Sequence, residues 1–414
     1  MLRILTGRAA EKRVVALERR GSQLDQVEPR VRKIVEDVRK TGDRALRRYA
    51  ERWDGLRTRQ ALRVPAAEMK QALDSVSFEF RRALEKAAAN ICRFCEWQRP
   101  QPWRREADGV AVGQVVRPLD SVGCYVPGGR YPLPSTLLMT VIPAQVAGVH
   151  EIRVVSPNPR PETLAAAAML GVREFYRTGG AQAIAALAYG TKSVPRVDKV
   201  VGPGNLYVTA AKKLVAFDCA IDMLAGPTEV VIVADEGDAR FIAADLVAQA
   251  EHDPEALAVF ISTNLKLAHS VAEQTASLAA ENPIAQESLR ANGVALLAGS
   301  RAQAMEWANR IAPEHITVSR ENAELVTNAG SIFIGDFSPQ AAGDYASGPN
   351  HVLPTAGAAR YRGGLSVFDF VKLITFQELS KKGVAGIAPV VVPLAEAEGL
   401  RAHAESVRLR CAHA

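Results

Sequence analysis

The six residues QAEHDP at positions 249–254 bring an amide, an imidazole and two carboxylates to the end of an apolar stretch, ARFIAADLVAQA. Gln249 and His252 are three positions apart, about 60° around a helix, so both side chains can face one point. Imidazole and side-chain oxygen are donors that bind divalent metals, and zinc takes three or four ligands. One imidazole and one amide are a weak signal of a metal site, and on these residues alone a polar helix end in water is the better interpretation.

Glu314 and His315, in the motif APEHITVS, are a second candidate pair. Histidine titrates near neutral pH and can accept a proton from an alcohol or from water, and a neighbouring glutamate can orient it or activate the water. Adjacent residues of a regular strand point to opposite faces, so a shared role requires the loop geometry that Pro313 favours. An exposed polar turn is the alternative.

Asp344 and His351 flank GDYASGPNH, in a long stretch with few regular signals, and such stretches in compact domains are usually functional. Glu398 and His403 are five positions apart near the end of the chain, about 140° around a helix, so helical spacing does not bring them to one site.

The elements that must position these residues alternate between short β-branched runs and Ala-rich stretches from about residue 110 onwards. This pattern predicts parallel βαβ units in two doubly wound series, the second starting at TEVVIVAD. A helix is predicted over 239–252, with Asp238 as its N-cap and Asp253–Pro254 as its end. Ligands of open parallel sheets bind beyond the carboxyl ends of the strands, where glycine-rich segments such as VGPGN (201–205) occur. Residues 1 to about 100 have helical periodicity.

Composition excludes several classes of protein. The chain has 414 residues, 48% hydrophobic and 23% charged, with a net charge of +6. The basic and acidic residues interleave, which argues against nucleic-acid binding. The uncharged run Tyr131–Val149 contains three prolines, which favours a buried helix over a membrane span. Five cysteines without a secretory signal favour the cytoplasm, and Cys92 and Cys95 are expected to be core residues rather than zinc ligands.

Taken together, the motifs resemble one family. CYVPGGRYPLPSTLLMTVIPAQVAGV, RTGGAQAIAALAYGT, VDKVVGPGN, AGPTEV, QAEHDP, APEH, GDYASGPNHVLPT and EAEGLRAH occur in the order and spacing of the histidinol dehydrogenases, from about residue 25 to 410. The resemblance implies NAD-dependent oxidation of L-histidinol to L-histidine through histidinal, with one zinc ion per site and two NAD⁺ consumed.

The resemblance also implies roles for individual residues. Gln249, His252, Asp344 and His403 match the zinc ligands, and Glu314 and His315 match the catalytic pair. Substrate contacts are implied for the metal ligands, for His315, and for Thr228, His351 and Glu398. Tyr125, Gln182 and Asn205 match NAD contacts. Threonine at position 228 stands where the family usually has serine. The family forms homodimers in which the last helix completes the partner's site, so Glu398 and His403 are expected to act in the other subunit.

On this basis we expect a small helical segment at 1–20, and a larger α/β domain with zinc and catalytic residues from 21–124 and 228–370. A second Rossmann-like, NAD-binding domain is expected at 125–227, and a helical segment reaching the partner at 371–414. Three alternatives remain: a dehydrogenase of another primary alcohol, such as a sulfonated diol; a zinc hydrolase with Glu314 as base; and a non-catalytic zinc-binding scaffold.

Overall fold

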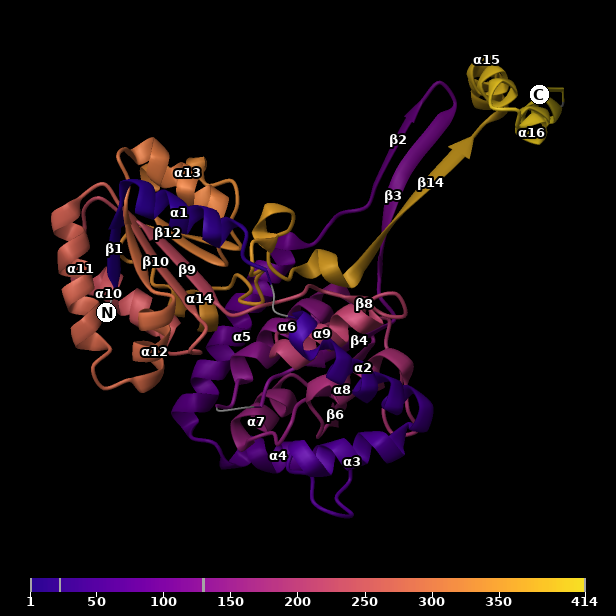
Figure 1. The fold of residues 1–414 in the computed structure, drawn as a ribbon. Coiled ribbons are helices and arrows are strands. Elements are labelled where there is room, and N and C mark those ends of the chain that lie inside the picture. Colours follow the sequence, from indigo (N-terminus) through magenta and orange to yellow (C-terminus); the bar gives the residue numbers. More distant parts are fainter. Residues whose placement is uncertain (1, 22–23, 129–130, 413–414) are drawn as a thin grey trace.

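The computed structural model describes residues 2–21, 24–128 and 131–412, which form two α/β bodies and a projecting arm (Figure 1). Both bodies are built on parallel sheets, as predicted. The first sheet has the order β6-β5-β4-β7-β8. Its strands are β4 (Ser121–Tyr125), β5 (Glu151–Val155), β6 (Glu174–Tyr176), β7 (Lys199–Val201) and β8 (Ala220–Ile221).

The second sheet repeats this order and adds one strand, giving β1-β11-β10-β9-β12-β13. Its strands are β1 (Arg3–Thr6), β9 (Glu229–Val233), β10 (Leu257–Ser262), β11 (Val294–Leu297), β12 (His315–Val318) and β13 (Ser331–Ile334). The run EVVIV of β9 is buried throughout, as expected of a central parallel strand covered on both faces. The prediction of two doubly wound units of similar build is therefore confirmed.

Helices cover both faces of each sheet. The five-stranded sheet carries α6 (Pro134–Ala147), α7 (Pro161–Met169), α8 (Gly180–Tyr189) and α9 (Leu206–Val215). The six-stranded sheet carries α1 (Gly7–Glu18), α10 (Ala239–Ala250), α11 (Leu265–Leu278), α12 (Pro283–Ala291) and α13 (Arg301–Ile311). The uncharged run at 131–149 forms α6, which is buried over most of its length. Among the described residues, none of the helices combines the length and hydropathy that a membrane crossing requires.

The first hundred residues differ from the expected division of the chain in two ways. Residues 3–6 are extended rather than helical, because β1 pairs in parallel register with β11. The helices α2 (Leu24–Thr41), α3 (Asp43–Trp53), α4 (Ala66–Ser75) and α5 (Phe78–Gln98) pack on α6, α7, α8 and α9. Val31 and Leu46 share a core with Ile184 and Leu187, so these helices belong to the five-stranded sheet rather than to the six-stranded one. The other domain boundaries remain predictions.

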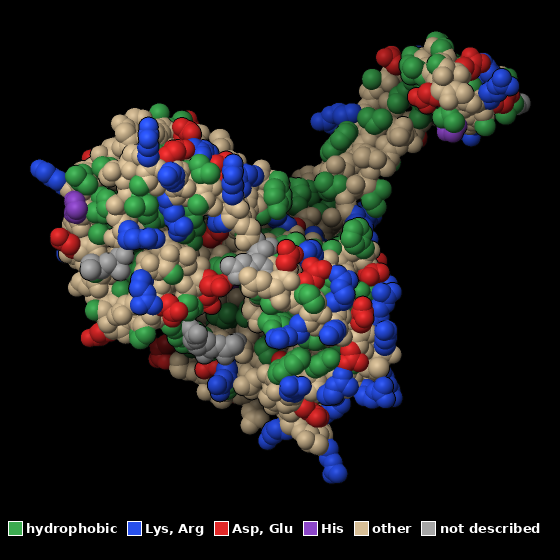
Figure 2. All heavy atoms as spheres, viewed as in Figure 1, with side chains coloured by type: hydrophobic (Ala, Val, Ile, Leu, Met, Phe, Trp, Pro, Cys, Tyr) green, Lys and Arg blue, Asp and Glu red, His purple; other side chains and the backbone are tan. Residues whose placement is uncertain are grey.

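The arm is a twisted antiparallel ribbon that leaves the body and carries two helices at its tip (Figures 1 and 2). It has the order β14-β3-β2, from β2 (Trp103–Ala107), β3 (Val110–Pro118) and β14 (Val371–Leu379). The tip helices α15 (Lys381–Ala397) and α16 (Arg401–Ala412) pack chiefly on each other. Residues 371–414, expected to be helical, thus begin with a strand, because β14 pairs along its whole length with β3.

Candidate active site

A cavity of about 200 Å³ lies between the two sheets, and six of the twelve expected site residues line it. Thr228 and Glu314 line it just before β9 and β12 begin, and the loop Gly202–Gly204 after β7 forms the opposite wall. For the six-stranded sheet the cavity therefore lies at the amino ends of the strands. The expectation of a site beyond their carboxyl ends is wrong here, because helices run antiparallel to their strands and α10 delivers Gln249 to the amino edge.

Glu314 and His315 are both buried at the start of β12. Glu314 lies in the loop before the strand, after Ala312, which has a left-handed φ of 49°. This loop geometry allows the two adjacent side chains to approach each other: His315 Nδ1 lies 3.6 Å from Glu314 Oε2. Burial raises the pKa of Glu314 to about 7, against the smaller opposing effect of His315.

His315 lies between two carboxylates. Its Nε2 is 3.7 Å from Asp344 Oδ1, on the side away from the Nδ1 contact with Glu314. Burial opposes its charged form, but the charge of Glu314, the hydrogen bond and charge of Asp344 and the hydrogen bond to Glu229 act the other way, and the pKa of His315 is raised to about 9. The Nδ1 atom lies 3.1 Å from the main-chain oxygen of Glu229. A carbonyl oxygen only accepts, so Nδ1 is the donor and Nε2 is the atom that can exchange a proton.

Thr228 joins Glu314 to Gln249. Its hydroxyl donates to Glu314 Oε2 at 2.5 Å and accepts a bond from Gln249 Nε2. Because a hydroxyl has one hydrogen, this chain fixes the orientation of the Gln249 amide. Within the described part of the chain the amide oxygen of Gln249 accepts no hydrogen bond, which leaves it available as a ligand.

His252, Asp344 and His351 line the same cavity. The helix α10 ends at Ala250, two residues before the predicted end, so exposed His252 lies in the turn that follows. His351 Nδ1 donates to the main-chain oxygen of Asp344 at 2.8 Å, and its Nε2 lies 3.3 Å from Thr136 Oγ1. Burial lowers the pKa of His351, so the ring is neutral and Nε2 accepts from Thr136.

The donor set suits zinc but is incomplete in one chain. His252 and Asp344 line the cavity and carry donors of the types that zinc binds, and Gln249 contacts Thr228, which lines it too. Within the described residues of a single chain, no group of three His, Cys, Asp or Glu side chains is close enough to hold a metal ion. A zinc ion here would need a further donor.

Glu398 and His403 lie on the arm and are exposed. Glu398 follows the end of α15, and His403 is in the first turn of α16. Figure 1 shows these helices at the end of the arm, far from the two sheets of their own chain. The arm also exposes large apolar side chains: Trp103, Leu373, Ile374, Val390, Leu394 and Leu409. A surface of this kind is typical of a protein interface.

The residues expected to contact NAD surround a second cavity, of about 530 Å³. Tyr125 ends β4, Gln182 is in the first turn of α8, and Asn205 caps α9 by accepting from Tyr207 N and Val208 N. This cavity lies at the carboxyl ends of β4 and β7, where the strand order of the five-stranded sheet reverses. Asn205 adjoins Gly204, so one loop lines both cavities.

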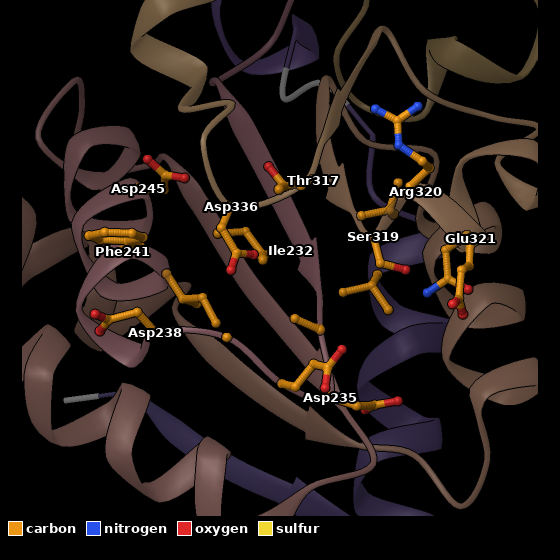
Figure 3. Close-up of a pocket in the computed structure, with 18 of the residues that line it drawn as sticks. Ile232, Asp235, Asp238, Phe241, Asp245, Thr317, Ser319, Arg320, Glu321 and Asp336 are labelled. Atoms are coloured by element: carbon orange, nitrogen blue, oxygen red, sulfur yellow. The ribbon is translucent and has the colours of Figure 1, made fainter.

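The six-stranded sheet has the equivalent crevice at the carboxyl ends of β9 and β12, with a volume of about 550 Å³ (Figure 3). Its charged lining residues are Asp235, Glu236, Asp238, Asp245, Glu321 and Asp336, with Arg301 and Arg320. Figure 3 shows Asp238 and Asp245 of α10 on the side of the crevice that faces Asp336. Arg301 is paired with Glu321. The excess of negative charge opposes a pyrophosphate, so the cavity beside β4 is the better dinucleotide site.

Sequence reasoning missed several residues of these sites. Thr136 was hidden in an uncharged run, although its PST context before a helix is a signal of a helix start. Asp54 is buried in the second cavity, where it accepts from Gly179 N and Gln182 Nε2, each at 2.9 Å. The pair Cys92 and Cys95 was expected in the core, but only Cys95 is buried, because i,i+3 spacing leaves Cys92 at the exposed edge of α5.

Comparison with known proteins gives one consistent result. A family model described as histidinol dehydrogenase matches residues 17–411. A histidinol dehydrogenase of Methanocaldococcus jannaschii is 45% identical over 407 residues, covering 95% of both chains. One from Bacillus cereus is 45% identical over 400 residues, covering 93% of both. A crystal structure of histidinol dehydrogenase from Elizabethkingia anophelis matches with a TM-score of 0.93 and 36% identity, over 99% of this chain and 98% of that one.

The two Rossmann-like sheets and these matches define an oxidoreductase. The chain belongs to the histidinol dehydrogenase family, and its activity lies in histidine biosynthesis.

Proposed function

We propose that the chain oxidises L-histidinol to L-histidine through L-histidinal, with two NAD⁺ as hydride acceptors and one zinc ion per site. The observation that carries the proposal is the convergence of Thr228, His252, Glu314, His315 and Asp344 on one cavity beside a second, dinucleotide-sized cavity. The overall change is one alcohol, one water and two NAD⁺ giving one carboxylate, two NADH and three protons.

His315 and Glu314 handle different proton transfers in the proposed reaction. Zinc, which Gln249, His252, Asp344 and a His403 from the second subunit would hold, would bind and orient the substrate, and NAD⁺ would accept the hydride. His315 accepts the hydroxyl proton at Nε2 in the first oxidation, because Glu229 already holds Nδ1. Glu314 activates the water that adds to the aldehyde, and its pKa of about 7 suits a group that takes up and releases a proton near neutral pH. The aldehyde hydrate then loses the second hydride.

His315 must be neutral when it accepts this proton. In the chain without ligands, the charge of Asp344 is one reason for its raised pKa. A cation held by Asp344 would offset that charge and lower the pKa of His315, which links the metal to the state of the base without a direct bond between them.

The charge of the cavity favours a cationic amine as substrate. Its lining residues include the carboxylates of Glu314 and Asp344, beside His315, and that of Asp222, which is paired with buried Lys212; no lysine or arginine is among the described lining residues. This lining opposes a sulfonated diol, the alternative within the same fold. Glu398 and His351 are proposed to contact the substrate as well.

The proposal includes a homodimer with shared sites, in which Glu398 and His403 of one arm complete the cavity of the other subunit. The support is the distance of the arm from its own cavity and its exposed apolar side chains. A cytoplasmic location is proposed because all five cysteines are free thiols, which suits a reducing compartment.

The direct test follows NADH absorbance with L-histidinol, with and without a chelator. The proposal expects NADH from histidinol, loss of the rate on chelation, and recovery with zinc. Turnover of a sulfonated diol instead of histidinol would favour the alternative alcohol dehydrogenase. Hydrolysis without any nicotinamide would favour the zinc hydrolase.

A further inference from the structure

Arg20, just after α1, forms a two-pronged ion pair with Glu229 at the start of β9. Its Nε lies 2.6 Å from Glu229 Oε1, and its Nη2 lies 2.5 Å from Oε2. The side chains are 16% and 5% exposed, respectively. A planar guanidinium that matches both carboxylate oxygens fixes orientation as well as charge.

The same guanidinium also binds the segment that leads into the catalytic pair. Its Nη1 donates to the main-chain oxygens of Leu17 and Ile311, each at 2.6 Å, and its Nη2 donates to that of Ala312 at 3.3 Å. Ala312 has the left-handed backbone conformation that ends α13, two residues before Glu314. Arg20 therefore ties the start of β9 to the turn before β12.

Glu229 contacts both members of the catalytic pair through its main chain. Its N–H donates to Glu314 Oε2 at 2.9 Å, and its carbonyl oxygen accepts from His315 Nδ1 at 3.1 Å. The side chain meanwhile accepts from Ala356 N at 3.0 Å. The main chain of Glu229 thus sets the position of Glu314 and the tautomer of His315. The orientation of that main chain depends in turn on the Glu229 carboxylate, which Arg20 holds from outside the cavity.

We propose that Arg20 and Glu229 are positioning residues for Glu314 and His315, so that the N-terminal segment of the chain is part of the catalytic apparatus. Neither residue lines the cavity, and both act through the backbone of Glu229 and of the turn at Ala312. The inference rests on the proposed roles of Glu314 and His315. Small displacements of reacting groups cost large factors in rate, so loss of this pair lowers kcat rather than cofactor affinity.

Arg13, on the helix α1 that precedes Arg20, offers a matched control. Its guanidinium is also partly buried and donates to a main-chain oxygen, that of Asn292 at 3.4 Å, but it contacts nothing that leads to the cavity. Replacing Arg13 with methionine removes a similar side chain from the same interface between α1 and the six-stranded sheet. It therefore reports how far a general loosening of that interface lowers the rate.

The test compares Arg20→Met, Arg20→Lys and Arg13→Met in the zinc-loaded full chain, with L-histidinol and NAD⁺. Arg20→Met is expected to lower kcat by about 10- to 100-fold with the KM for NAD⁺ within about twofold and the zinc content unchanged. Arg20→Lys keeps the positive charge but lacks the planar guanidinium that donates to both carboxylate oxygens, so its kcat should lie between those of Arg20→Met and the wild type. Arg13→Met keeps kcat, whatever it does to the melting temperature.

A double variant distinguishes positioning from a separate defect. If Arg20 acts through His315, Arg20→Met costs much less in a His315→Gln background than in the wild type, because the group it positions is already gone. Glu229→Gln replaces Arg20→Met if that variant does not fold, since glutamine keeps the shape and the acceptor for Ala356.

The outcomes distinguish a failure of the positioning role from a failure of the proposed catalytic pair. Wild-type kcat in both Arg20→Met and Glu229→Gln, or equal losses in Arg20→Met and Arg13→Met, would overturn the positioning role. If His315→Gln itself retains the wild-type rate, the proposed catalytic pair fails, and the inference fails with it.

Discussion

The hydroxyl of Thr228 lies 2.5 Å from Glu314 Oε2 and accepts the side-chain N–H of Gln249, so one residue links a proposed base to a proposed metal ligand. Thr228→Val keeps the shape and removes this link. We expect zinc affinity or kcat to fall by about 10- to 100-fold, as for other residues that orient metal ligands. Zinc titration with a competing chelator and steady-state rates measure this loss.

Thr228→Ser is the matched control for this substitution. Serine keeps the hydroxyl and loses only the methyl group, so rates and zinc affinity should stay close to wild type. Equal losses in the valine and serine variants would show that packing, rather than the hydrogen-bond chain, accounts for the effect.

His315→Gln removes the only ring nitrogen proposed to accept the substrate proton. Loss of a general base lowers kcat by about 10²- to 10⁴-fold. Zinc content should be unchanged, because Asp344, which lies 3.7 Å away, keeps its own side chain. Elemental analysis beside the rate assay checks both parts, and an unchanged rate would exclude His315 as the base.

Asn205 serves two purposes that substitution can separate. It caps α9 and lines the second cavity. Asn205→Ala should raise the KM for NAD⁺ and destabilise the fold by about 1 kcal/mol through loss of the cap. Asn205→Asp keeps the cap but adds a charge that repels pyrophosphate, so it should raise the KM without the loss of stability. A normal KM in both variants would place the dinucleotide elsewhere.

The acidic crevice of the six-stranded sheet predicts a pH-dependent stability. Burial raises the pKa of Asp245 from 3.8 to about 6. The folded state therefore binds this proton more tightly than the unfolded state, and the resulting stability is present below about pH 4 and lost as the pH rises through 6. At pH 8 the ionised group costs at most roughly 3 kcal/mol.

Asp245→Asn should therefore raise the free energy of unfolding at pH 8 and change it little at pH 4. Asp238, on the same helix, has its pKa lowered to about 2 by Arg240, so Asp238→Asn should have the opposite sign at pH 8. Urea unfolding at both pH values measures the difference. Equal stabilisation by Asp245→Asn at pH 4 and pH 8 would contradict this assignment.

The sheets were predictable because buried parallel strands are short apolar runs between Ala-rich helices, as in β9 and α10. The arm was not, because β14 is exposed on most of its length and is held by pairing with β3, more than 250 residues earlier in the chain. Sequence periodicity reports burial, and a ribbon exposed on both faces leaves no such pattern.

The site residues also divide into those that the sequence predicted and those that it did not. Most of the residues implied by the motifs meet at two cavities. Arg20 was missed because it lies in none of the motifs and its partner Glu229, in the motif AGPTEV, is 209 positions away. The expected location of the candidate active site was also wrong for the six-stranded sheet. The carboxyl-end rule describes ligands at strand crossovers, whereas Thr228 and Glu314 precede their strands.

Heterodimers made from two variants test most directly whether the site is shared. A His252→Ala chain and a His403→Ala chain, carrying different affinity tags, are co-expressed and purified through both tags. Each homodimer should be inactive, whereas the heterodimer combines one intact cavity with one intact arm and should recover about half of the wild-type rate. A heterodimer as inactive as its parents, or the failure of two tags to co-purify, would contradict the account.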